Sequence, residues 1–206
     1  MITAPHRGRF VKYQLTLALF PFLALKLLKL SVSSDEFQET LQLKKRIKRA
    51  LKERETPYLL AIELDKILRW KLDKQYHRSK QQREINVDEV VVPITQACFS
   101  IRSDDKNYEI ELKLKTLTTM RGVAIPLASA ILAICFPDEF VVIDSLLWEL
   151  IYEEEKSSFT VSDYLKFLSF FSSLSKHAKC SPRCSSHATR MSFWLGALPS
   201  SVCRAA

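Results

Sequence analysis

Residues 117–132 read LTTMRGVAIPLASAIL and predict two helices joined by a tight turn. Gly122 allows the chain a positive φ where the first helix ends, a conformation that other residues adopt only at a cost. Pro126 suits the first turn of the second helix, where its missing N–H group is not needed. Val123 is expected to fill the space between the helices, and the small side chain of Ala128 lets them cross closely. The stretch therefore predicts a tightly packed pair of helices.

Helical periodicity continues on both sides of this stretch. Apolar residues recur at helical spacing over residues 37–51, 59–72, 108–117 and 161–174. Thr56 is expected to cap a helix that begins at Pro57, because threonine is a good N-cap and proline suits the first turn. Asp104 or Asp105 is expected to open the helix over residues 108–117.

Residues 90–99 fit either a strand or a helix. The valine run 90–92 favours a strand, Pro93 is unfavourable in the interior of either element, and Asn86 or Asp88 would cap a helix. The chain has only three glycines, which argues against a turn-rich β-sandwich or barrel. It also leaves no glycine-rich phosphate loop, so a nucleotide-binding fold of that type is not expected. We therefore expect an all-α fold.

Positive charge is concentrated in the first half of the sequence. The formal net charge is +8, and residues 1–86 carry 19 basic and 9 acidic side chains, whereas residues 87–175 carry 7 and 14. This balance permits a polyanionic partner. Lys45, Arg46 and Arg49 lie on the basic face of the first expected helix. That face is either a solvated surface or a stripe that contacts DNA phosphates.

The cysteines indicate a reducing compartment. There are five, and an odd number does not suit a framework of disulfides. Cys98 and Cys135 stand inside apolar segments, where a cysteine behaves as a small buried hydrophobic residue. We therefore expect a cytoplasmic protein.

Residues 1–33 form an apolar and basic N-terminal extension. Within it, residues 15–30 are mostly apolar and follow a basic start, as in a signal peptide. Pro21 and two lysines interrupt the apolar run, which leaves it short of the ~20 residues that a membrane span requires. The segment is an amphipathic helix, a signal or anchor, or a poorly structured extension. We expect no membrane partner, a helical domain over residues 34–175, and a basic, weakly ordered tail over residues 176–206.

The pattern of residues 117–132 resembles the helix-hairpin-helix motif, with Ala124 where a second glycine is usual. A Phe-Pro pair then ends the second helix, and an apolar stretch leads to Asp144. An aspartate in the matching place occurs in the DNA glycosylase superfamily that includes the 8-oxoguanine, adenine-mismatch and 3-methyladenine enzymes. The resemblance covers mainly residues 112–150. It implies a helical fold of two lobes with the hairpin at its centre.

The resemblance also implies double-stranded DNA as the partner. A DNA phosphate would be held at the hairpin, mainly by backbone N–H groups, at the positions Gly122, Val123, Ala124, Ile125 and Ala128. Asp144 would stabilise an oxocarbenium-like transition state, or position a water, as the N-glycosidic bond breaks. Asp144 also stands where it would cap a helix over residues 145–152, and the two roles are compatible.

Bifunctional members of this superfamily place a Schiff-base lysine just after the hairpin glycines. Pro126 occupies that place here, so the resemblance implies release of a damaged base by hydrolysis, without strand cleavage. It implies no cofactor and no metal, because Cys180, Cys184 and Cys203 are too few for the four-cysteine iron–sulfur cluster of one branch. The alternative is a non-catalytic helical protein that binds DNA or another protein, which Ala124 and the acidic surroundings favour.

Overall fold

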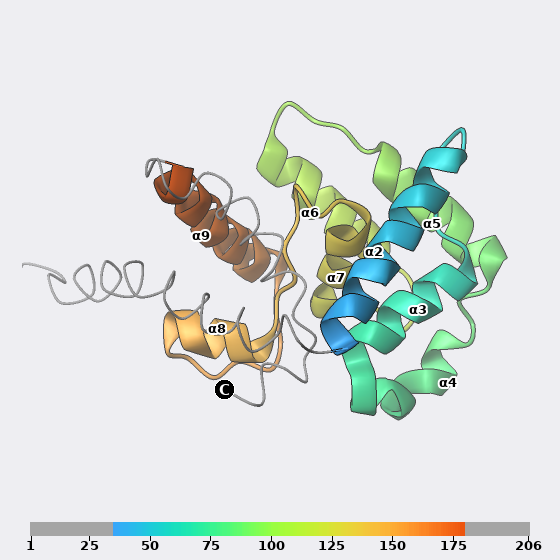
Figure 1. The fold of residues 1–206 in the computed structure, drawn as a ribbon, viewed down its shortest axis with the longest axis horizontal. Coiled ribbons are helices and arrows are strands. Elements are labelled where there is room, and N and C mark those ends of the chain that lie inside the picture. The colour runs from blue at the N-terminus through green and yellow to red at the C-terminus, as the bar shows by residue number, and fades with distance from the viewer. Residues whose placement is uncertain (1–34, 180–206) are drawn as a thin grey trace, which may run out of the picture.

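The computed structural model describes residues 35–179, and this part of the chain is helical, with no strand (Figure 1). The elements in order are α2 (Asp35–Glu53), α3 (Ala61–Leu72), the 3-10 helix η1 (Asp73–Ser79), α4 (Lys80–Arg83), α5 (Asp88–Ser100), α6 (Lys106–Leu117), α7 (Ile125–Cys135), α8 (Ser145–Tyr152) and α9 (Val161–Lys179). The all-α prediction is confirmed. The expectations for the N-terminal extension and for the tail cysteines fall outside the described residues.

Helix α7 lies at the centre of the hydrophobic core. Every residue from Leu127 to Cys135 is buried, as expected for a helix that is apolar on all sides. Helices α2, α3 and α6 pack around it, and α5 packs on α6 (Figure 1). Cys98 and Cys135 are both buried free thiols, which confirms their predicted role as core residues. None of the described helices is long and apolar enough to cross a membrane.

Helix α3 begins at Ala61, so the prediction of a helix capped by Thr56 and starting at Pro57 is wrong. The residues just before α3 are held extended by distant partners. The amide of Leu59 donates to the Thr95 hydroxyl at 2.9 Å, and the amide of Ala61 donates to the Asp88 carboxylate at 2.6 Å. These tertiary hydrogen bonds satisfy backbone N–H groups at the start of α3 that have no partner within the helix.

The ambiguous segment around the valine run is the helix α5, which contains Pro93. Its N-cap is Val87, without a side-chain cap, so the expectation that Asn86 or Asp88 caps it is wrong. The Asp88 carboxylate serves α3 instead, through its hydrogen bond to the Ala61 amide. The side chain of Asn86 bonds to the hairpin instead, at the backbone of Arg121.

Helix α6 is capped as predicted. The carboxylate of Asp105 accepts hydrogen bonds from the amides of Asn107 and Tyr108, at 2.9 and 3.2 Å. One turn later the buried carboxylate of Glu109 forms ion pairs with Lys106, at 2.9 Å, and with Lys113, which is buried beside it. Hydrogen bonds from these two lysines lower the pKa of Glu109 to about 2, against the opposing effect of burial.

This buried carboxylate makes the fold sensitive to acid. Because the pKa of Glu109 is lower in the folded chain, its stabilising contribution is complete above the ordinary value of 4.5 and is lost as the pH falls towards 2. We expect the free energy of unfolding to fall by about 2 kcal/mol between pH 6 and pH 3 through this group. Urea denaturation at pH 6 and pH 3 measures it, and Glu109→Gln should show a smaller drop. An equal drop in the free energy of unfolding in both proteins would show that Glu109 is not the cause of the acid sensitivity.

Between α7 and α8 the chain makes a partly exposed turn at residues 137–139 and is then buried and non-helical over residues 140–143. Residues 140–143 are at most 5% exposed, and side chains satisfy part of their backbone. The hydroxyl of Ser129 accepts a hydrogen bond from the Ile143 amide at 3.1 Å, and the hydroxyl of Tyr164 donates to the Val141 carbonyl at 3.0 Å. Helix α9 then packs on α6, and α8 and α9 lie to one side of the other helices (Figure 1). Helix α9 runs to Lys179, past the predicted domain boundary at residue 175.

Candidate active site and nucleic-acid interface

The turn between α6 and α7 has the predicted hairpin geometry. Gly122 adopts a φ of +72°, in the left-handed region that glycine enters without steric cost. Val123 is 4% exposed and Ala128 is fully buried, so both side chains fill the space between the helices. Pro126 lies in the first turn of α7, where its missing N–H group leaves no hydrogen bond unmade.

Ala124 causes no backbone strain, although the helix-hairpin-helix pattern usually has glycine there. It is the N-cap of α7 with φ −92° and ψ 174°, an extended conformation open to every residue. Its carbonyl accepts the hydrogen bonds of the Leu127 and Ala128 amides, both at 2.9 Å. Ala124 is exposed, whereas Val123, Ile125 and Ala128 are buried. A ligand at this end of α7 would therefore meet the backbone and Ala124 rather than those buried side chains.

The hairpin is held from one side by the end of α4 and by the residues that follow it. The side-chain amide of Asn86 donates to the Arg121 carbonyl at 2.8 Å and accepts from the Arg121 amide at 3.2 Å. The buried side chain of Arg83 lies over Gly122, so close that a Cβ on the glycine would sit 2.9 Å from Arg83 Cγ. The turn is thus held by side chains that are distant in sequence.

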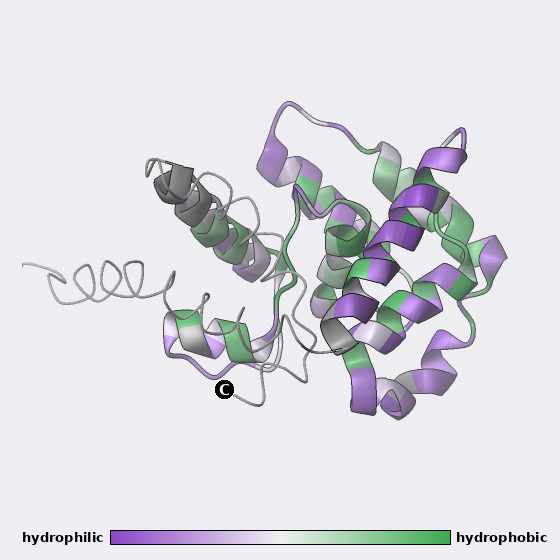
Figure 2. Cartoon of the chain, in the orientation of Figure 1, coloured by the Kyte–Doolittle hydropathy of each residue, from purple (hydrophilic) through white to green (hydrophobic). Residues whose placement is uncertain are grey.

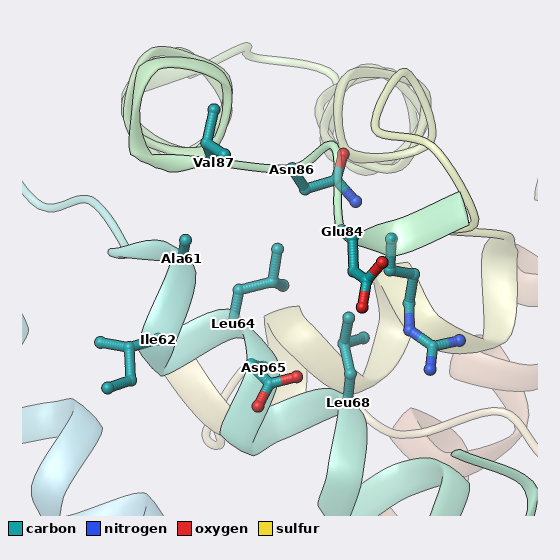
Figure 3. A pocket seen from close by; sticks show the side chains of 9 residues that line it. Ala61, Ile62, Leu64, Asp65, Leu68, Glu84, Asn86 and Val87 are labelled. Carbon is teal, nitrogen blue, oxygen red and sulfur yellow. The ribbon is translucent and has the colours of Figure 1, made fainter. Parts of the chain in front are cut away.

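A pocket of about 290 Å³ opens beside these side chains (Figure 3). Its floor is formed by α3, including Leu64, Asp65 and Leu68, and its upper edge by Glu84, Asn86 and Val87. Neither Asp144 nor the hairpin lines it.

Asp144 is the N-cap of α8, as predicted. One carboxylate oxygen accepts a hydrogen bond from the Leu146 amide at 3.0 Å, and the backbone carbonyl accepts from the Trp148 amide at 2.8 Å. The preceding residue, Ile143, is bonded to Ser129 on α7, whose hydroxyl also donates to the Pro126 carbonyl at 2.8 Å. Ser129 therefore ties the chain next to Asp144 to the first turn of the hairpin's second helix.

The structure pairs Asp144 with a residue that the sequence pattern did not single out. Lys71, near the end of α3, donates from Nζ to the second carboxylate oxygen of Asp144 at 2.7 Å. The side chains of Lys71 and Asp144 are 8% and 17% exposed. Charges this far from water are stable only when paired, so each fixes the other's position. The sequence did contain a sign that Lys71 is buried, because Lys71 stands on the same helical face as Leu64 and Leu68, which are buried.

The basic face of α2 is exposed to solvent. Lys45, Arg46 and Arg49 are all exposed, and hydrophilic positions recur along α2 (Figure 2). At one end of α2 the Thr40 hydroxyl accepts from Trp70, next to Lys71, at 2.8 Å. At the other end Arg54 pairs with Glu63 at 2.8 Å. The three cations lie between these two contacts along the chain, and the cation bonded to Asp144 is Lys71.

The described residues contain no cluster of three or more His, Cys, Asp or Glu side chains that would hold a metal ion. Burial raises the pKa of Cys98 to about 12 and that of Cys135 well above its ordinary value, so both thiols stay protonated and unreactive. Among the described residues, the Asp144 carboxylate and the Lys71 ammonium form an ion pair next to Ile143, which is bonded to Ser129 on α7.

Comparison with models of known protein families, with curated proteins and with solved structures finds no match to this chain.

Proposed function

We propose that this chain is a DNA glycosylase-like protein that hydrolyses the N-glycosidic bond of a damaged base in duplex DNA. The observation that supports the proposal is the connection between two elements. A hairpin with a positive-φ glycine leads into α7, and Ser129 on α7 holds the chain beside the partly buried Asp144 carboxylate. The two-lobed arrangement of the superfamily is part of this proposal, with α8 and α9 contributing to the second lobe.

In this mechanism the base leaves with the bonding electron pair and positive charge develops on the sugar. The Asp144 carboxylate stabilises that charge, a water attacks the anomeric carbon, and the proton that the water loses is taken up by the departing base. Each carboxylate oxygen can accept more than one hydrogen bond, so those from Leu146 and Lys71 leave acceptor capacity for the substrate. Because Pro126 occupies the place of the family's lysine, no covalent sugar–enzyme intermediate and no strand cleavage are expected.

A second candidate is a non-catalytic helical protein that binds DNA or another protein. One observation favours it. Both carboxylate oxygens of Asp144 already serve the fold, one as the cap of α8 and one as the partner of Lys71. An aspartate with these two structural roles needs no catalytic role to explain its position.

Base release separates the two candidates. Duplex oligonucleotides carrying oxidised, alkylated or deaminated bases are incubated with the chain and with Asp144→Asn, which keeps a good N-cap side chain. The proposal expects release by the wild type only, with DNA binding retained in the variant. The matched control is Asp105→Asn, which changes the cap of α6 and should leave release unaltered.

The outcomes are distinct. Binding without release from any lesion would favour the non-catalytic candidate. Absence of both binding and release would make the hairpin a structural turn. Strand cleavage by β-elimination, or an adduct trapped by borohydride, would contradict release by water.

A further inference from the structure

The segment between α3 and α5 connects the two parts of the proposed site. It begins at Asp73, two residues after Lys71, which pairs with Asp144, and it reaches the hairpin at Arg83, whose side chain lies over Gly122. Asp73, its first residue, has φ 46° and ψ −120°, a conformation that a residue with a Cβ rarely adopts. After this turn η1 packs against α3, because Tyr76 of η1 contacts Asp65 and Arg69 of α3.

One aromatic side chain anchors this segment on its inner side. Tyr76 is 6% exposed, and its hydroxyl donates to the Asp65 carboxylate. The guanidinium groups of Arg69 and Arg83 lie 4.4 and 4.7 Å from the centre of the Tyr76 ring. Arg83 also donates to the Tyr76 carbonyl, so the anchor and the residue that covers Gly122 are bonded to each other. Arg83 therefore links Tyr76 of the segment to Gly122 of the hairpin.

The outer side of the same segment is basic and exposed. Lys74, His77, Arg78 and Lys80 are all exposed. Lys80 has Glu84 as a partner at 3.5 Å. Lys74 and Arg78 have no carboxylate partner among the residues that the structure describes. They are exposed cations on η1, and Arg121 of the hairpin is exposed as well.

We propose that Lys74 and Arg78 contact phosphates of the same DNA duplex that the hairpin binds, which makes η1 a second DNA-contacting element. This inference rests on the proposed function. Its basis is charge complementarity, because unpaired cations attract a polyanion and release its counterions. The geometry adds that η1 begins two residues after Lys71, the partner of Asp144, and that Arg83, which lies against Gly122, donates a hydrogen bond to the carbonyl of Tyr76 in η1.

The test is the salt dependence of duplex binding, measured by fluorescence anisotropy with an undamaged oligonucleotide of about 20 base pairs. The variant Lys74→Gln/Arg78→Gln removes two cations from η1. The control Lys66→Gln/Lys166→Gln removes two exposed lysines, one on α3 and one on α9. Circular dichroism checks that both variants keep the helical fold.

Loss of two phosphate contacts is expected to reduce the slope of log affinity against log salt by about 1.8, and the control should match the wild type. Wild-type binding with the same slope in the Lys74/Arg78 variant would overturn the inference and leave the proposed function standing. An equal reduction in variant and control would overturn it too, because the effect would then come from net charge alone. No binding by the wild type would defeat the proposed function and, with it, this inference.

Discussion

Gly122→Ala is expected to lower the free energy of unfolding by about 3 kcal/mol. Two causes add. Alanine is strained at the φ of +72°, and its Cβ would lie 2.9 Å from Arg83 Cγ. Arg83 cannot move aside easily, because it is buried and donates a hydrogen bond to the Tyr76 carbonyl. Urea denaturation of the purified variant measures the loss.

The matched control is Ala124→Gly, two residues along the same turn. Because Ala124 has an ordinary extended backbone, glycine should relieve no strain there and should cost less than about 1 kcal/mol through the entropy of the unfolded chain. A clear gain in stability from Ala124→Gly would show that alanine is strained at the second position. Similar small losses from both substitutions would show that the turn does not depend on the conformation of Gly122.

Lys71→Met is expected to lower the free energy of unfolding by about 2 kcal/mol. The substitution leaves the Asp144 carboxylate, which is only 17% exposed, with the hydrogen bond from Leu146 but without its counter-charge. The expected loss is smaller than for a fully buried pair, because water still reaches Asp144. Asp144→Asn should also be destabilising, since it removes the negative charge that faces the buried Lys71 ammonium.

The double variant Lys71→Met/Asp144→Asn tests whether the two side chains act as a pair. If they do, the double variant should be less destabilised than the sum of the two single variants, by about 1 kcal/mol or more. The same double-mutant cycle on Lys115 and Glu111, a pair at the surface of α6, should give a coupling well below that. Strict additivity at Lys71 and Asp144 would mean that their contact contributes nothing to stability.

Several features of the fold were predictable because their causes are local. The positive φ of Gly122, the cap of α6 at Asp105 and the cap of α8 at Asp144 each depend on residues within one helical turn. The end of α7 before the Phe-Pro pair is of the same kind. A sequence pattern encodes such features directly, because backbone sterics and capping act over a few residues.

Other features were missed because their causes are tertiary. The start of α3 depends on Asp88, 27 positions downstream, and the hairpin is braced by Asn86, 35 positions before Arg121. The valine run with Pro93 reads as an ambiguous segment, yet it is helical, with Val91 and Thr95 buried. Propensity is a weak influence that packing against neighbouring helices overrides.

The sequence by itself therefore determined an all-α chain, the hairpin over residues 117–132 and the position of Asp144 at a helix start. The tertiary structure decided which charges meet. Lys71 and Asp144 are 73 positions apart, and they pair because the end of α3 and the start of α8 come together. The structure also placed Arg83 of α4, 39 positions earlier in the chain, against Gly122 of the hairpin. Burial makes an unpaired charge costly, and the fold alone decides which charges are buried.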